Sequence, residues 1–183
     1  MNRKFVMING LAFSEESDMK KLKKYAKEGW ILEGIAINFF YKLKKDKPKA
    51  IDYCLDYQGE ANEEYFSLLL EAGWTRVVSV GNEMHIFSAA EGTKPIYSDR
   101  ESEIDKYERV KRQMGKGSIY SLIAMFIFIF VGKVLVSAIS LNTISNIIFL
   151  LFMASMISFV FNFMPYLAYT YRLRNLKKSE NRL

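Results

Sequence analysis

The pattern of apolar and charged positions divides the chain into two parts. Residues 118–171 contain one charged side chain, Lys133, whereas charged residues are frequent in the part that precedes them. Within this region the apolar runs 118–139 and 146–170 are each long enough, at about 1.5 Å of helix per residue, to cross a hydrocarbon layer of about 30 Å. A short uncharged segment, 140–145, separates them. The pattern therefore predicts two transmembrane helices that form a hairpin.

The first 92 residues show a different pattern, one that is typical of a folded α+β domain. The order strand, helix, strand, strand is predicted twice, in residues 4–43 and again in residues 51–89. Two such units imply a largely antiparallel sheet with both helices packed on one face. The predicted fold class is therefore α+β, with a duplicated β-α-β-β cytoplasmic domain followed by the two-helix transmembrane hairpin.

A Gly-Trp pair marks the first unit. Gly29 ends the predicted helix, because a residue without a Cβ readily adopts the left-handed conformation of a helix cap. Trp30 then begins an extended segment. The predicted elements of this unit are a strand over residues 4–9, a helix over 15–28, and a hairpin over 30–41 that turns near Gly34 or Asn38.

The second unit repeats this pair as Gly73 and Trp74, and we expect the two tryptophans to occupy equivalent core positions. Its first strand alternates apolar and polar side chains, so Asp52 and Asp56 should point to the same face. The predicted elements of this unit are a strand over residues 51–57, a helix over 62–72, and a hairpin over 77–87 that turns at Gly81 and Asn82.

Residues 93–117 are predicted to form a linker and a juxtamembrane helix. Ser98 or Asp99 is placed to cap this helix at its N-terminus, where an oxygen-bearing side chain accepts hydrogen bonds from free backbone N–H groups. Gly115 and Gly117 lie just before the first apolar run and are interpreted as a hinge.

The formal net charge of +6 is unevenly distributed. Residues 1–99 carry 14 Lys and Arg against 15 Asp and Glu, a net charge of −1, whereas residues 100–183 carry 12 against 5, a net charge of +7. This excess flanks the apolar runs, including the basic tail 171–183, and no basic residue lies between them. The chain is therefore predicted to be a multi-pass protein of the cell membrane with both termini in the cytoplasm. No nucleic-acid partner is expected.

Two basic features have alternative interpretations. Lys133 lies inside the first apolar run, so it belongs either to a functional polar pathway or to a helix end from which its long stem reaches the outer headgroups. The basic segment 42–49 is either a solvated loop or a contact with anionic headgroups beneath the anchor.

Residues for catalysis are sparse. Cys54 and His85 are the only residues of their types, so no cofactor or metal site is expected and a Cys-His pair has little support. His85 is interpreted as a surface or rim residue. Asp52 and Asp56 lie four residues apart on one strand, about 13 Å, which is too far for a carboxylate pair acting on one bond. Solvent exposure or pairing with lysine is the simpler interpretation of both.

A set of aromatic, glycine and aspartate positions is scattered between residues 4 and 107. It consists of Gly29-Trp30, Tyr41, Tyr53, Asp56-Tyr57, Tyr65, Gly73-Trp74 and Ile96-Tyr97-Ser98-Asp99. These positions resemble a domain-of-unknown-function family of Gram-positive bacteria, whose members are often encoded beside PadR-type transcriptional repressors and in many cases carry C-terminal transmembrane helices. Where members often have Trp-Leu, this chain has Lys21 and Leu22. The resemblance implies no catalytic activity.

Three functions follow as hypotheses. The first is a non-enzymatic, membrane-anchored binding or regulatory module of unknown ligand. Its expected protein partner is a regulator, such as a PadR-type repressor, or a transporter subunit, and a second copy of the chain is a further candidate. The second is a small membrane subunit of a transport or immunity system, for which Lys133 would be the working residue. The third, a membrane-tethered DNA-binding protein, is disfavoured by the net charge of residues 1–99.

Overall fold

The computed structural model describes residues 2–59, 61–81, 83–97, 100–138 and 142–180. By its internal contacts the chain divides into two compact units, Met1–Arg109 and Val110–Leu183. The first unit contains the strands and two short helices. The second contains most of two long helices, and each unit is described by itself below.

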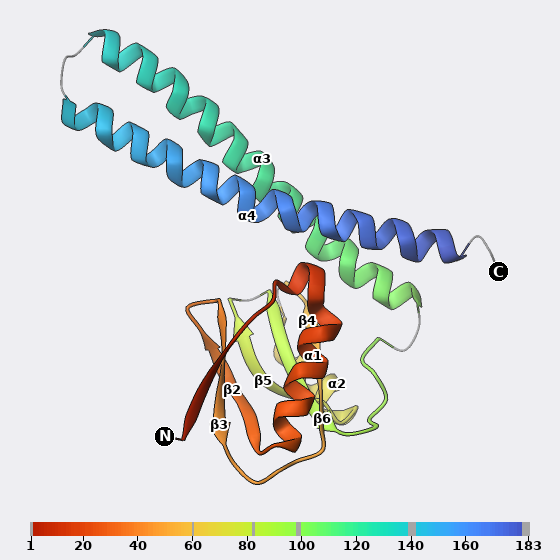
Figure 1. Cartoon of the computed structure of the whole chain (residues 1–183). Helices are drawn as coiled ribbons and strands as arrows, with labels where there is room; N and C mark the ends of the chain where they lie inside the picture. The colour runs from red at the N-terminus through yellow and green to blue at the C-terminus, as the bar shows by residue number, and fades with distance from the viewer. Residues whose placement is uncertain (1, 60, 82, 98–99, 139–141, 181–183) are drawn as a thin grey trace. The chain divides into compact units, whose positions relative to one another are not determined.

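The first β-α-β-β set forms a three-stranded antiparallel sheet (Figure 1). Strand β3 lies in the centre and pairs with β1 on one side and β2 on the other. Ser14 departs from helical geometry inside the first helix, so the regular part of that helix begins at Glu15, as the sequence predicts. The elements are β1 (Arg3–Met7), α1 (Leu11–Lys27), β2 (Trp30–Ala36) and β3 (Phe40–Lys45).

The second set forms a separate sheet with the same internal order, in which β6 lies between β4 and β5. The helix α2 begins after Asn62, whose side chain accepts a hydrogen bond from the backbone N–H of Tyr65. The mixed α+β fold class is thus confirmed. The elements are β4 (Ile51–Tyr57), α2 (Glu63–Glu71), β5 (Thr75–Val80) and β6 (Met84–Ala90).

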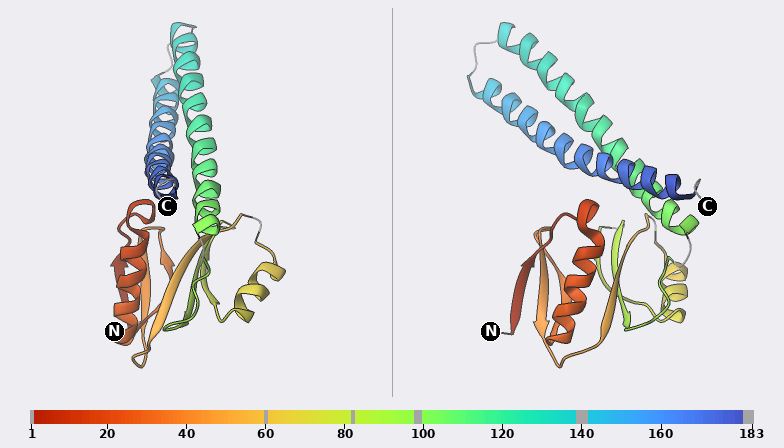
Figure 2. Two further views of the ribbon diagram at one scale, coloured as in Figure 1. Left: turned by 90° about the vertical axis from the view of Figure 1, so that its right-hand side faces the viewer. Right: turned by 45° about the vertical axis from the view of Figure 1, so that its right-hand side comes forward.

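The prediction that both helices cover one face of a single sheet is wrong. Helix α1 packs against β2 and β4, whereas α2 packs against β5, and the two helices lie on opposite sides of the second sheet (Figure 2). The physical reason is that β4 has buried side chains on both faces. Leu55 and Asp56 are neighbours on that strand, point in opposite directions and are both almost fully buried.

The two Gly-Trp pairs share a backbone conformation but not an environment. Gly29 and Gly73 have φ values of 79° and 89°, the left-handed region that favours glycine. Trp74 is buried and its indole N–H donates to the Lys94 carbonyl at 2.9 Å. Trp30 is only half-buried, and the Lys45 ammonium lies 4.9 Å from its ring centroid. The expectation of equivalent core positions is therefore wrong.

The second unit is built from α3 (Arg100–Ala138), whose first ten residues belong to the first unit, and α4 (Asn142–Glu180). Both helices are long and apolar enough to span a membrane. The expected hinge is absent, because α3 continues unbroken through Gly115 and Gly117. A Cβ on Gly117 would lie 2.7 Å from Cγ of Asn162, so this glycine permits the close approach of α4.

Candidate functional site

The two aspartates of β4 have different surroundings. Asp52 pairs with Lys23 of α1 at 2.5 Å and accepts a hydrogen bond from the backbone N–H of Gly92 at 2.9 Å. Burial acts to raise the pKa of Asp52, but these two hydrogen bonds outweigh it and lower the pKa. Lys23 also pairs with Glu91 at 3.0 Å. Asp52 is thus part of a surface ion-pair cluster, in agreement with the simpler interpretation.

Asp56, in contrast, is the centre of a buried hydrogen-bond network. It is 1% exposed, and its carboxylate accepts hydrogen bonds from the hydroxyl groups of Tyr65 on α2 and of Tyr97. The backbone N–H of Tyr57 donates to the Oδ1 atom at 2.6 Å. The guanidinium of Arg109 on α3 lies 3.5 Å from the same oxygen and donates to the Tyr97 hydroxyl at 3.1 Å. This carboxylate therefore connects β4 and α2 to the first turns of α3.

A second buried contact joins the same turns of α3 to α1. Lys106 forms an ion pair with Glu15, and their side chains are only 3% and 9% exposed. The hydroxyl of Tyr107 donates to the second oxygen of Glu15 at 3.3 Å. The Lys106 ammonium also lies 5.1 Å from the ring of Tyr97, which links the two contacts. We call these residues the α3 network: Glu15, Asp56, Tyr65, Tyr97, Lys106, Tyr107 and Arg109.

The α3 network has the chemistry of a structural contact between elements. Burial first, and then the negative charge of Asp56, raise the pKa of Tyr65 and of Tyr97, so both phenols remain protonated donors. Both oxygens of Asp56 already accept hydrogen bonds. The network therefore holds the first turns of α3, residues 100–109, against the rest of the first unit, and its groups satisfy one another.

The interpretation of His85 as a surface residue is wrong, since it is 2% exposed. It pairs with Asp56 in the β4–β6 register and packs edge-on against Phe66, with ring centroids 5.3 Å apart. Its Nε2 lies 3.2 Å from the Gln58 carbonyl oxygen, which can only accept, so Nε2 carries the proton. Nδ1 then accepts from the Ser79 hydroxyl at 2.8 Å. Helix α2 covers this strand face, which periodicity alone does not reveal.

Cys54 is not placed to act as a nucleophile. Its partner across the β4–β6 ladder is Phe87, whereas His85 faces Asp56, so the thiol and the imidazole occupy different positions on the sheet. Burial raises the pKa of the Cys54 thiol to about 11, which leaves it protonated at neutral pH. Among the described residues, no group of three His, Cys, Asp or Glu side chains could hold a metal ion.

A further buried carboxylate, Asp18, was not singled out by the sequence. It is fully buried, and its Oδ2 accepts from the backbone N–H of Asn9 and from the hydroxyl of Tyr41, each at 3.1 Å. Its other oxygen has no partner among the described residues. Burial and the charge of Asp18 raise the pKa of Tyr41. The spacing of polar residues along α1 does not predict that Asp18 and Glu15 are both buried.

The remaining predicted positions are dispersed. Lys133 is exposed on α3, away from the α3 network in sequence. Asp99, the predicted helix cap, lies outside the described residues. Tyr57, one of the positions that carry the family resemblance, is buried. Its backbone N–H donates to Asp56 and its carbonyl oxygen accepts from Nε of Arg109 at 3.0 Å. Tyr57 therefore contacts two residues of the α3 network through its backbone.

The fold and the α3 network define a class of protein, a small α+β domain fixed onto the first turns of a helix that continues into an apolar pair. The chain belongs to the family described as "Protein of unknown function (DUF2812)", whose model matches residues 14–119, more than half of the 183 residues. The expected membership of a domain-of-unknown-function family is thereby confirmed. No curated protein and no solved structure matches the chain.

The matched range has a structural meaning. It contains every residue of the α3 network, from Glu15 to Arg109, and it ends at the first residues of the apolar run. It leaves out β1, the second half of α3 and all of α4, and with them nearly all of the two apolar runs. The family is therefore defined by the α+β domain together with the start of α3.

Proposed function

We propose that this protein is a membrane-anchored regulatory module whose α+β domain binds a protein partner on the cytoplasmic side. Two long apolar helices and the basic residues that flank them support the anchoring and the orientation. The observation that carries the regulatory part is the α3 network. It joins three elements of the domain, α1, β4 and α2, to the helix that leads to the membrane.

The physical argument rests on the cost of buried charge. Removing an ion pair such as Glu15–Lys106 from water costs several kcal/mol per ion, and apolar side chains would hold α3 in place without that cost. A buried pair instead specifies one docking geometry, because any displacement of α3 leaves a charge without a partner. A partner that shifts α1 or β4 would therefore change how α3 is held, and the hairpin would receive the change.

The partner that this proposal favours is a transcriptional regulator. The resemblance to a family often encoded beside PadR-type repressors points to such a protein, and the excess of acidic residues in residues 1–99 disfavours direct binding of DNA by the domain itself. Lys133 lies near the end of α3, where its long stem can reach the headgroups, and the proposal adopts that interpretation of this residue.

A pair of substitutions tests the proposal in the full-length protein held in lipid nanodiscs. Lys106→Met leaves Glu15 buried without its partner, which costs about 3–5 kcal/mol, so we expect faster amide hydrogen exchange in residues 100–109 and reduced capture of the partner from solubilised membranes. Adding Glu15→Met should restore the slow exchange, because two apolar side chains pack without a buried charge.

The matched control is Lys20→Met on α1, the helix that carries Glu15. Lys20 pairs with Glu16 on the surface, and both side chains are more than 70% exposed. We expect this variant to behave like the wild type in both measurements. The proposal is contradicted if no specific partner is captured by the wild type, or if Lys106→Met leaves exchange and capture unchanged.

A further inference from the structure

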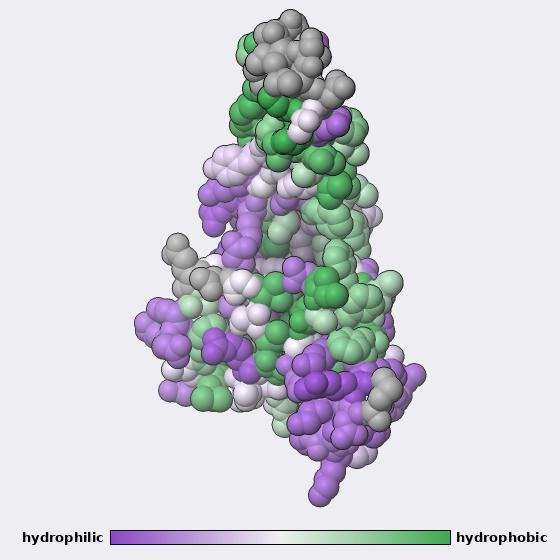
Figure 3. Space-filling model, turned by 90° about the vertical axis from the view of Figure 1, so that its left-hand side faces the viewer, coloured by the Kyte–Doolittle hydropathy of each residue, from purple (hydrophilic) through white to green (hydrophobic). Residues whose placement is uncertain are grey.

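One end of the α+β domain exposes large apolar side chains to solvent. Ile37, at the turn between β2 and β3, is 82% exposed, Phe13 at the start of α1 is 64% exposed and Phe39 is 53% exposed. On the face shown in Figure 3, hydrophobic residues lie above a densely hydrophilic region at the lower right, and hydrophilic residues also line the left flank. We call Ile8, Phe13, Ile37 and Phe39 the apolar tip.

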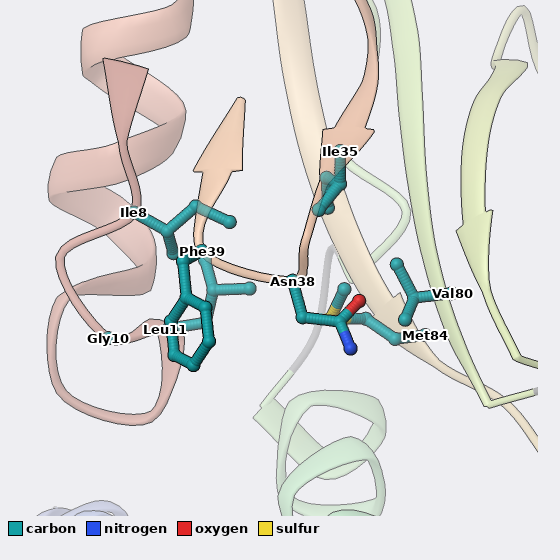
Figure 4. Close-up of a pocket in the computed structure, with 8 residues that line it drawn as sticks. All are labelled: Ile8, Gly10, Leu11, Ile35, Asn38, Phe39, Val80 and Met84. Atoms are coloured by element: carbon teal, nitrogen blue, oxygen red, sulfur yellow. The ribbon is translucent and has the colours of Figure 1, made fainter. Parts of the chain in front are cut away.

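Behind the apolar tip lies a pocket of about 360 Å³. Three segments of the first unit line it: the connection from β1 to α1, the β2–β3 hairpin and the β5–β6 hairpin (Figure 4). Ile8 and Phe39 lie on one side of it, and Val80 and Met84 on the other. The amide of Asn38 is the single polar side chain among its lining residues. The tip and the pocket together form a largely apolar surface.

The backbone at the tip is strained in a way that presents an apolar side chain. Ile37 and Asn38 have φ values of 53° and 61°, both in the left-handed region. Asn tolerates this conformation, whereas a β-branched residue such as Ile is strongly disfavoured in it. A glycine would relieve the strain, yet the chain places its most exposed large hydrophobic residue there. Strain of this kind accumulates at positions with a function.

The first unit also shows which end of the domain leads to the apolar helices. Lys106 of α3 pairs with Glu15, two residues after Phe13, so the chain leaves the domain beside the apolar tip. From Arg109 to the first residue of the apolar run, Ser118, nine helical residues span only about 14 Å. The polar interface of a bilayer is itself about 5–8 Å deep on each side. The tip is therefore tethered within reach of it.

The basic segment 42–49 leads to the other end of the domain: residues 42–45 are the last residues of β3, and residues 46–49 form a loop. Its residues Asp46 and Pro48 lie against Gly29, at the C-terminal end of α1, and α1 is about 25 Å long. Two of its lysines are also paired within the domain, Lys42 with Glu33 and Lys49 with Asp46. This arrangement favours the solvated-loop interpretation for residues 46–49, whereas residues 42–45 are part of a strand. The apolar tip, and not this loop, is the surface beside Lys106, near the end of the first unit.

We propose that the apolar tip is a lipid-contact surface, which inserts Ile37, Phe39 and Phe13 into the boundary between headgroups and acyl chains of the bilayer that holds the anchor. This inference rests on the anchoring part of the proposed function. Aliphatic and aromatic side chains at a convex tip suit this boundary, since they gain from leaving water without needing a charged partner. Insertion fixes the domain against the membrane at a second point, so release of the tip becomes a way for a partner to act.

The experiment uses the full-length protein in nanodiscs of phosphatidylcholine and phosphatidylglycerol, with Cys54→Ala to leave a single labelling site. An environment-sensitive fluorophore is attached after Ile37→Cys or, in a second variant, Phe39→Cys. Quenching by lipids that carry a nitroxide near the headgroup is then measured. The control variants are Lys47→Cys in the basic loop and Phe126→Cys in the apolar run.

We expect the labels at positions 37 and 39 to lose fluorescence nearly as strongly as the label at position 126, and the label at position 47 to be unaffected. If the label at 126 is quenched while those at 37 and 39 behave like that at 47, the lipid-contact inference is overturned and the anchoring stands. Labels at 37 and 39 that are shielded from water but not quenched by lipid show that a protein covers the tip, which also overturns it. An unquenched label at 126 overturns the anchoring itself and the inference with it.

Discussion

The side chains that organise this domain are buried charges whose partners come from distant parts of the sequence. Glu15 meets Lys106, and Asp56 meets Tyr97 and Arg109. Asp52, only four residues from Asp56, instead belongs to a partly exposed ion-pair cluster with Lys23. Two aspartates of one strand therefore differ in role because different elements cover them.

Asp52 gives a prediction at this scale. Its pKa is lowered in the folded protein, so its contribution to stability is present above the unfolded value of about 3.9 and is lost as the pH falls through the lower folded value. We expect the free energy of unfolding to fall between about pH 5 and pH 3, and to fall less in Asp52→Asn. Both tryptophans lie in the α+β domain, so the intrinsic fluorescence of the full-length protein in detergent reports its unfolding.

The control for this measurement is Glu16→Gln, which alters an exposed pair with Lys20 at 3.8 Å. This variant should keep the pH dependence of the wild type. An Asp52→Asn variant with an unchanged pH dependence would contradict the assigned role of Asp52.

At the scale of elements, the two β-α-β-β sets follow the same local rules. In each, the helix ends at a left-handed glycine, and the second strand shifts register against the third four residues after that glycine, at Glu33 in β2 and at Val77 in β5. Such a shift bends and twists a strand locally. The correspondence is the structural counterpart of the repeated Gly-Trp pair.

The glycine that ends α1 gives the prediction at this scale. Gly29→Ala should destabilise the domain by more than about 1 kcal/mol, because its φ of 79° is unfavourable for alanine. A Cβ there would also lie 2.6 Å from the Asp46 carbonyl oxygen. Thermal unfolding followed by tryptophan fluorescence measures the change.

Gly34→Ala is the matched control, since no atom lies within 4 Å of the added Cβ and the position has no positive φ. We expect its stability to stay within about 0.5 kcal/mol of the wild type. Equal stability of the two variants would show that the cap at Gly29 does not limit the fold.

At the scale of the whole molecule, the distribution of basic residues predicts a topology. The basic residues around Arg109 and in the tail 171–183 flank two apolar helices that have no basic residue between them. Under the proposed function, the positive-inside rule predicts that the α+β domain lies on the cytoplasmic side.

Reporter fusions test this topology. Green fluorescent protein fused after Leu183 should fluoresce, and alkaline phosphatase at the same point should be inactive, because both ends of the chain are expected in the cytoplasm. Alkaline phosphatase inserted after Leu141, between the two apolar runs, should be active. Active phosphatase at the C-terminus would refute the predicted orientation.

The sequence by itself determined what depends on neighbours along the chain. The strand Ile51–Tyr57, the helix that begins after Asn62, the glycine caps and the two apolar helices all follow from local periodicity, capping and hydropathy. These signals depend on residues that are close together along the chain, so they can be recognised in a single sequence.

Only the tertiary structure decided which faces become interior. It separated the strands into two sheets with α1 and α2 on opposite sides of the second, buried His85 and Asp56 beneath α2, and left Trp30 at the margin. It also brought Glu15 to Lys106 across 91 positions of sequence. The physical reason is that the local pattern predicts a polar side chain to be on the surface, whereas burial depends on whether a distant element packs over it and supplies hydrogen bonds. Which element does so is a property of the packed fold and not of the local pattern.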